Sequence, residues 1–432
     1  MNRYRWVRNS KTIVLFVLVA GSLLLSYFLW SGNLEEGEEI GFVQAPSLPI
    51  AATPDIAKAV RPYAITISTS QGQTVVNPDS SDYTYWSNQL HTAHTYASQT
   101  VKTLPKQLEM CVTFEFGISI SHSLGTNWLS NFGSTVNAWS GREIVLYKLP
   151  DDNACRVALI GDSSIMTMKT DLNVSQLLQH ADSNVKREPY DVVGEGSSIS
   201  YVPQHLTMKT ATYRVRQPDS LPLIHTFFVN PQATTRIQEN AHTLLWTDGT
   251  RAVQWDKQQQ TLQYEDPNGE QLAIHKNPFL AVIDFIQEHG GGASNVIGFD
   301  AVGALTSDAD AYTYAFMQYE NGFPILSPDA DYDIDFENER VENYQRPMWV
   351  MQQPIHQSTV NIIDVNELKQ VMAGLDKHDP LQNFKIVLGY AATPEGTTSM
   401  LLQPVYLVTN SSGDSFVINA VDGTPMPGSD IA

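Results

Sequence analysis

The longest apolar stretch of the chain is TIVLFVLVAGSLLLSYFLW, Thr12 to Trp30, which contains no charged residue and no proline. A helix of these nineteen residues rises about 28 Å, close to the roughly 30 Å hydrocarbon core of a bilayer. Basic side chains precede it and acidic ones follow it, namely Arg3, Arg5, Arg8 and Lys11 against Glu35, Glu36, Glu38 and Glu39. Because basic residues stay on the cytoplasmic side, residues 1–33 are predicted to be a cytoplasmic tail and a single-pass anchor in the cell membrane, with the remainder extracytoplasmic.

A cleaved secretory signal is the competing interpretation of this stretch, since it also begins with a basic segment and an apolar run. Here the run is longer than usual and ends in the bulky sequence YFLW rather than at a pair of small residues. These features favour an uncleaved anchor.

One face of the predicted anchor helix carries a candidate partner-binding surface, formed by Leu15, Leu18, Ser22 and Ser26. The two serines form a small-xxx-small pair, which lets membrane helices approach closely and exchange a hydrogen bond. The alternative is a chance pair, because serines are common in anchors.

Beyond an acidic and then proline-rich linker at 34–55, the apolar periodicity predicts a first α+β domain at 56–216. Its predicted strands are Tyr63–Thr69, Cys111–Ile120, Glu143–Leu149 and Arg156–Ile160, and its predicted helices are Tyr85–Leu104 and Val174–Val185.

A middle α+β domain is predicted at 217–350. Asp248-Gly249 joins two apolar runs, which is a strong hairpin signal. The other predicted elements are a strand at Ile224–Val229, a short helix at Pro231–Asn240, hairpins at Asp266–Gly269 and Glu320–Gly322, and a strand at Tyr332–Phe336. A helix is predicted where Phe279, Val282, Ile283 and Ile286 recur on one face and Gly290 ends the pattern.

The last predicted domain, 351–432, repeats this order with a helix at Asp364–Leu375 and strands at Lys385–Tyr390, Ser399–Thr409 and Ser415–Ala420. The predicted fold class is therefore α+β: an N-terminal transmembrane helix followed by three extracytoplasmic α+β domains with antiparallel sheets, the last two similar to each other.

The composition excludes one class of partner. The formal net charge is −20, and four of the basic residues precede the anchor, so the outer part is still more acidic. Such a field repels nucleic acid and anionic polymers. Two cysteines, Cys111 and Cys155, lie in the outer part. A disulfide between them would contribute about 4 kcal/mol, and two buried free thiols in neighbouring strands are the open alternative.

No assembled catalytic, cofactor or metal site is predicted. Gly161-Asp162-Ser163 after a strand resembles the nucleophile block of SGNH-type esterases, but no histidine follows an aspartate at the spacing that chemistry uses. A strand-to-turn connection is therefore favoured.

The alternating Asp329, Asp331, Asp333 and Asp335 lack the glycine and glutamate of a calcium loop, so a solvated strand face is favoured over weak cation binding. His91 and His94 lack a third ligand and are interpreted as surface residues.

Three stretches carry a resemblance to the YycH family: FFVNPQATTRIQENAHTLLWTDGTRAVQW from Phe227 to Trp255, FLAVIDFIQEHGG from Phe279 to Gly291, and the Arg-Pro pair in Tyr344–Pro347. The anchor ending in LLSYFLW is similar to the amino terminus of that family. The resemblance is clearest at 225–350.

This resemblance implies a non-enzymatic regulator of Gram-positive bacteria, anchored by one transmembrane helix. In that family the anchor associates with the transmembrane helices of the WalK (YycG) sensor histidine kinase, which controls cell-wall metabolism, and the outer domains pair with a YycI-like membrane protein. Two other functions remain as alternatives: an extracytoplasmic receptor for a wall fragment or peptide, which predicts a defined outer pocket, and a secreted esterase using Ser163.

Overall fold

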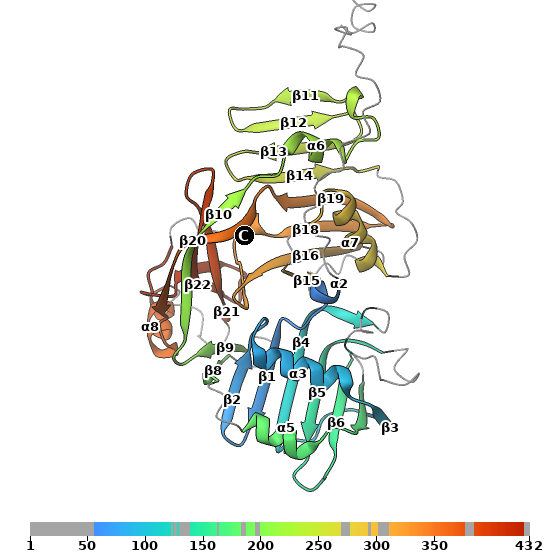
Figure 1. The fold of residues 1–432 in the computed structure, drawn as a ribbon, viewed down its shortest axis with the longest axis vertical. Helices are drawn as coiled ribbons and strands as arrows, with labels where there is room; N and C mark the ends of the chain where they lie inside the picture. The colour runs from blue at the N-terminus through green and yellow to red at the C-terminus, as the bar shows by residue number, and fades with distance from the viewer. Residues whose placement is uncertain are drawn as a thin grey trace, which may run out of the picture. The chain divides into compact units, whose positions relative to one another are not determined.

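The computed structural model describes residues 56–121, 139–161, 164–182, 187–194, 199–268, 277–292, 295–300, 311–375 and 384–426, and also Leu124 and Trp128. All of them belong to one compact unit, Leu48–Ala432. They fold into sheets with few helices (Figure 1), and the ladders between their strands are antiparallel. The predicted antiparallel sheets are confirmed, whereas the transmembrane helix, the three-domain division and the likeness of the last two domains stay predictions.

The predicted anchor, residues 12–30, lies outside the described ranges, as does the linker at 34–55. Among the helices of the described residues, none has the length and apolar character needed to cross a bilayer.

The first sheet has seven strands in the order β2-β1-β4-β5-β6-β7-β3. Helices α3 (Ser81–Thr92) and α5 (Val174–Ala181) cover one of its faces (Figure 1), where Trp86 is fully buried in the same core as Phe114 and Leu177. The strands are β1 Ala64–Thr69, β2 Gly72–Val76, β3 Thr95–Val101, β4 Met110–Ser121, β5 Ser140–Lys148, β6 Cys155–Ile160 and β7 Ile165–Thr170.

The predicted helix Tyr85–Leu104 is wrong in its second half. Helix α3 ends at Thr92, and Thr95–Val101 forms edge strand β3 on β7. The segment TYASQTV is rich in threonine and other residues that favour extended backbone, and its pairing with β7 replaces the helical hydrogen bonds.

The second sheet runs β11-β12-β13-β14-β19-β18-β16-β15, with β17 beside β16. Helix α7 (Pro278–Glu288) buries Phe279, Val282, Ile283 and Ile286 as predicted. The strands are β11 Thr235–Gln238, β12 Thr243–Thr247, β13 Ala252–Asp256, β14 Thr261–Glu265, β15 Val296–Asp300, β16 Ala311–Glu320, β17 Phe323–Pro324, β18 Tyr332–Glu337 and β19 Arg340–Pro347.

Two of the predicted hairpins in this region are confirmed. Asp248-Gly249 joins β12 to β13, and Asn321-Gly322 joins β16 to β17 with positive φ at both residues, as a tight turn of this kind requires. The hairpin predicted at Asp266–Gly269 is wrong, because the strand before it, β14, already pairs with β13 and β19.

In residues 220–240 the predicted strand and the predicted helix are both wrong. The segment predicted as strand Ile224–Val229 begins inside helix α6 (Ser220–His225), which buries Leu223 and Ile224. The segment predicted as helix Pro231–Asn240 is one 3₁₀ turn at Pro231–Ala233 followed by strand β11. Pairing of β11 with β12 outweighs the local helical preference.

The third sheet runs β20-β10-β22-β21, with β23 beside β22, and α8 (Val365–Leu375) follows β20. Its strands are β10 Thr207–Arg216, β20 Val350–Asn361, β21 Lys385–Pro394, β22 Ser399–Thr409 and β23 Ser415–Asn419. The strand β10, placed by the sequence at the end of the first domain, therefore pairs with strands that follow it by more than a hundred residues. A separate hairpin, β8 (Tyr190–Val193) and β9 (Ser200–Pro203), precedes it.

Candidate ligand-binding cavity

A cavity of about 680 Å³ opens where strands of all three sheets meet. This volume lies within the range of roughly 300–1,000 Å³ that is usual for small-molecule sites. Its lining comes from β1, β2, β4 and β5 of the first sheet, from β15, β16 and β17 of the second, from β21 and β22 of the third, and from the hairpin of β8 and β9. Aliphatic and aromatic side chains make up much of the wall, among them Ile199, Phe299, Met317, Leu326, Leu388 and Leu407.

Two carboxylates lie on one side of the cavity. Val112 and Phe114 of β4 point into the core beneath the helices, so the alternation of the strand turns Glu115 to the opposite face. Glu143 of β5 lies directly across from Glu115 in the register of the two strands. Burial, and then the charge of Glu115, raise the pKa of the Glu143 carboxyl above its usual value. Like charges directly opposite each other destabilise an antiparallel pair.

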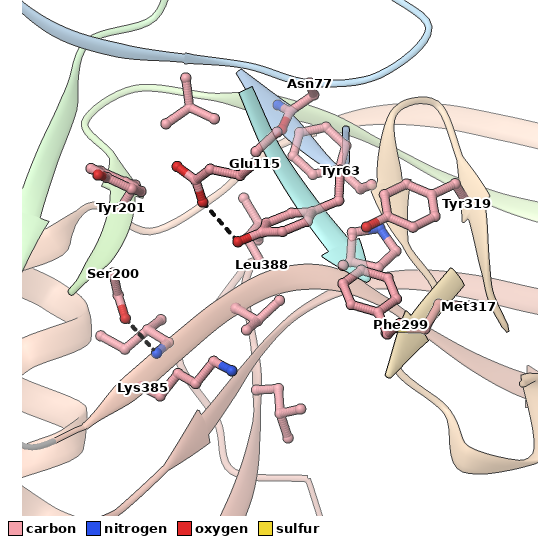
Figure 2. Close-up of a pocket in the computed structure, with 18 of the residues that line it drawn as sticks. Tyr63, Asn77, Glu115, Ser200, Tyr201, Phe299, Met317, Tyr319, Lys385 and Leu388 are labelled. Carbon is pink, nitrogen blue, oxygen red and sulfur yellow. Dashed lines mark hydrogen bonds between the residues drawn. The ribbon is translucent and has the colours of Figure 1, made fainter. Parts of the chain in front are cut away.

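The Glu115 carboxylate is held in position by two hydroxyl groups. Tyr63 Oη donates to Glu115 Oε2 at 2.7 Å (Figure 2), and Thr66 Oγ1 donates to Glu115 Oε1 at 2.9 Å. Burial and then the charge of Glu115 raise the pKa of the Tyr63 hydroxyl. Tyr63 therefore stays a neutral donor, and Glu115 stays oriented toward the cavity.

Glycine at position 117 lets the first and second sheets approach closely beside the cavity. A Cβ atom there would lie 2.5 Å from the backbone oxygen of Gly298 and 2.5 Å from Cδ1 of Phe299. Next to this contact Arg142 Nη2 forms an ion pair with Asp300 Oδ1 at 2.5 Å. The cavity wall is thus a fixed contact between β4 and β15 rather than an adjustable loop.

The sequence-predicted partner-binding residues Leu15, Leu18, Ser22 and Ser26 lie outside the described residues, so that face stays a prediction. Ser163 also lies outside them. Around it, Ile160 pairs with Ile165, and Gly161 N donates to Ser164 O at 3.1 Å. The segment therefore connects two antiparallel strands, as the favoured turn interpretation expects.

The acidic strand and the two histidines are placed as predicted, with one difference. Tyr332, Ile334 and Phe336 are buried, so Asp333 and Asp335 share the other face of β18, whereas Asp329 lies in the 3₁₀ turn Pro328–Ala330 and Asp331 directly precedes the strand. That face is half-buried rather than fully solvated, and burial followed by the charge of Asp335 raises the pKa of Asp333 to about 6. In the described part of the chain, no group of three or more potential ligands is arranged to hold a metal ion, and His91 and His94 are exposed.

The two cysteines are free. In the strand register, Cys155 of β6 pairs with Lys148 of β5, and Lys148 pairs with Met110 of β4. Cys111 follows Met110, so its side chain points to the opposite face of the sheet from that of Cys155. The cysteines therefore face opposite sides of the sheet and are two strands apart, about 9–10 Å, beyond the Cα separation of about 7 Å that a disulfide tolerates. The disulfide alternative is wrong, and β5 lies between the strands that carry the two thiols.

Comparison with known proteins places this fold in a family. The family model described as "YycH protein, C-terminal domain" matches residues 198–411. The chain belongs to the YycH family. This match includes the middle region that carried the resemblance in the sequence, so the predicted family is confirmed. No curated protein matches the sequence.

One solved structure agrees with this assignment at the level of the fold. The crystal structure of YycH from Bacillus subtilis superposes with a TM-score of 0.64 at 13% identity, covering 85% of this chain and 97% of that one. An uncharacterized protein from Eubacterium rectale ATCC 33656 gives a TM-score of 0.36 at 9% identity, covering 55% of this chain and 93% of that one. The YycH fold therefore extends beyond residues 198–411 into the first sheet.

Sequence reasoning missed the cavity residues of this YycH-family chain. Glu115, Glu143 and Tyr319 come from three strands in two sheets, and Tyr63 directly precedes β1; only the strand register brings the two glutamates together. One signal was present in the sequence: a glutamate within each of two strongly apolar predicted strands.

Proposed function

We propose that this YycH-family chain is a non-enzymatic accessory regulator of a cell-wall two-component system. The observation that carries the proposal is the family match over residues 198–411. Membership in the YycH family supports an extracytoplasmic, membrane-associated regulator of the WalK (YycG) system. With one predicted anchor, an outer signal would reach the cell interior through that anchor or through another membrane protein.

The proposed route inward is the anchor face formed by Leu15, Leu18, Ser22 and Ser26. Small residues on this face would let the helix pack closely against the transmembrane helices of the kinase. A YycI-like membrane protein is the proposed partner of the outer domains. Changing the equilibrium between two helix arrangements is sufficient for regulation, because a partner that binds one arrangement better shifts the population toward it.

The experiment that tests this proposal is an anchor swap. Residues 12–30 are replaced by an unrelated apolar helix of equal length, and the output of the kinase is compared among native, swapped and deletion strains at equal protein levels. We expect the swapped strain to behave like the deletion strain. Native output from the swapped strain would contradict the proposed role of the anchor face.

A smaller change isolates the two serines. Ser22→Leu with Ser26→Leu keeps the length and apolar character of the helix but blocks close approach, so we expect less kinase to co-purify with the double variant. A matched control replaces Val17 and Leu24 with isoleucine; these residues lie off the proposed face. Equal recovery of the kinase with both variants would reject the face.

A second candidate function is a receptor for an outer ligand, such as a wall fragment or a peptide. The cavity of about 680 Å³ favours it, because the sequence-based receptor alternative required a defined outer pocket. The two functions are compatible, since a ligand bound outside could bias the anchor.

A further inference from the structure

Strand β20, Val350–Asn361, lies at the edge of the third sheet. In the sheet order of the described residues, β10 is its one neighbour. The stretch from Gln352 to Thr359 is exposed at every residue, and because successive side chains of a strand point to opposite faces, neither face of this stretch is covered. The outer edge of β20 therefore presents free N–H and C=O groups, which are a template for pairing with a further strand.

The composition of β20 leaves part of this edge unprotected. None of its residues is Asp, Glu, Lys or Arg, although charged side chains are a usual protection of a strand edge. Pro354 has no N–H to offer, and the pairing with β10 is irregular opposite it, at Thr212, Tyr213 and Val215. The remainder of the strand, Ile355–Asn361, contains neither a proline nor a charge and can pair along its whole length.

The two ends of β20 lie beside opposite charges. At one end Arg216 of β10 pairs with Val350, and Arg214 lies two residues earlier; both arginines are exposed, and neither takes part in an ion pair formed within the described residues. Beyond the other end come Asp364 and Glu367, where helix α8 begins. An antiparallel pair of two copies places the basic end of each beside the acidic end of the other, and two-fold symmetry makes this contact twice. The charges therefore favour a second copy of the chain as the occupant of the edge.

The charges that oppose such a pair are farther apart. Lys209 of β10 pairs with Thr359 near the acidic end, but two β20 strands would separate β10 of one copy from β10 of the other. Strands lie about 4.8 Å apart, so this separation is about 14 Å, beyond the Debye length of about 8 Å at physiological salt. The remaining net negative charge of the chain is screened in the same way, and β20 itself adds none to the contact.

We propose that β20 pairs in antiparallel orientation with β20 of a second copy of this chain, which joins two five-stranded sheets into one continuous sheet. The two-fold axis of such a pair passes through the point where one residue faces its own copy. When Ile355–Asn361 is paired along its whole length, that central residue is Ser358. Backbone hydrogen bonds supply the affinity, as in other cases of strand addition.

This inference goes beyond the proposed regulatory function. The pairing needs neither the kinase nor a YycI-like partner, and it can be measured with the purified full-length protein in phosphatidylcholine vesicles.

Cysteine cross-linking tests the pairing and its register. Ser358→Cys places a thiol opposite its own copy, at a Cα separation of about 4.5–5.5 Å that suits a disulfide. Gln352→Cys is the matched control on the same exposed strand, because its two copies would lie about 40 Å apart along the paired strands. With a mild oxidant we expect Ser358→Cys to give at least roughly tenfold more covalent dimer than Gln352→Cys, and the native chain, which keeps Cys111 and Cys155, gives the background. Equal yields from the two variants would indicate chance collision or contact through the anchors alone and would overturn the proposal.

A charge swap at the axis distinguishes a second copy from any other occupant. Ser358→Lys and Ser358→Glu each place like charges opposite each other in a self-pair, so each variant alone should associate more weakly than the native chain. A one-to-one mixture pairs lysine with glutamate and should associate roughly threefold or more tightly than either variant alone. Association is followed by energy transfer between donor-labelled and acceptor-labelled copies in the same vesicles, and thermal unfolding of each variant verifies its folding.

The same two substitutions at Gln352 provide the control for the charge swap. They should gain nothing from mixing, because the two copies of this residue do not face each other in the proposed register. If the mixture of the Ser358 variants is no tighter than either variant alone, then β20 does not face its own copy, a strand of another protein becomes its partner, and the proposal is overturned.

Discussion

Replacing Gly117 with alanine should loosen the contact between the first and second sheets. The new Cβ would lie 2.5 Å from Gly298 O and from Phe299 Cδ1, against 3.4 Å or more for an ordinary contact. One strand must therefore move by about 0.9 Å. The strand β15 cannot retreat, because the ring of Phe279 already lies so close that a Cβ on Gly298 would be 2.7 Å from it.

Forcing an extra methyl group into a closely packed contact costs roughly 1–3 kcal/mol. The upper half of that range applies here, because a backbone oxygen is among the atoms in the way and cannot rotate aside. We expect a loss of about 2 kcal/mol in the free energy of unfolding, measured by urea titration followed by tryptophan fluorescence. The midpoint should fall while the slope with denaturant stays the same.

Gly374→Ala provides a matched control in helix α8. Nothing lies within 4 Å of its Cβ position, and alanine is favoured over glycine in a helix by about 0.5–1 kcal/mol, so this variant should be as stable as the native protein or more stable. If Gly117→Ala unfolds at the native urea midpoint, then β4 and β15 are not in the close contact on which the cavity wall depends.

Three further predictions concern stability. Phe279→Ala removes a side chain that is 1% exposed and stacks on Phe316 with ring centroids 5.3 Å apart. It should lower the free energy of unfolding in urea by about 3–5 kcal/mol, whereas Leu280→Ala at a half-buried position on the same helix should lower it clearly less. Equal losses in the two variants would contradict the difference in burial. Burial raises the pKa of Asp333 to about 6, so the folded state holds the proton of this carboxyl more tightly than the unfolded chain does. The free energy of unfolding should therefore fall as pH rises from about 4 to about 6. Asp333→Asn should flatten this pH dependence, and an unchanged dependence would refute the prediction. Burial lowers the pKa of His289 to about 4, so the folded protein should lose stability as pH drops from about 6.5 to about 4. His289→Gln should reduce this loss in thermal unfolding scans. An identical dependence of the unfolding temperature on pH in the two proteins would contradict the prediction.

The sequence predicted those elements whose signal is local. The turns at Asp248-Gly249 and Asn321-Gly322 require positive φ, which Gly249, Asn321 and Gly322 adopt, and the apolar spacing of α7 matched the face it buries. It failed where pairing with a distant strand decided the outcome. Thr95–Val101 is a strand because β7 is beside it, and Thr235–Gln238 is one because β12 is.

The cavity could not be predicted for the same reason. Glu115 faces Glu143 only because β4 and β5 pair in one particular register; a shift by one residue would turn one of the two carboxylates to the helix-covered face. Tyr319 reaches the cavity from another sheet. Pairing, not composition, assembles the candidate site.

The position of β10 has a consequence for how the chain must be made. In synthesis and export, residues emerge from the amino terminus, so Thr207–Arg216 appears before both of its sheet neighbours, whose paired residues include Val350 and Leu402. Until they arrive, both edges of this strand lack their final partners, which is the condition that invites wrong pairing. A premature stop at 350 would thus leave β10 without its sheet partners rather than give a shorter working protein. The unpaired strand would then be accessible to a quality-control protease.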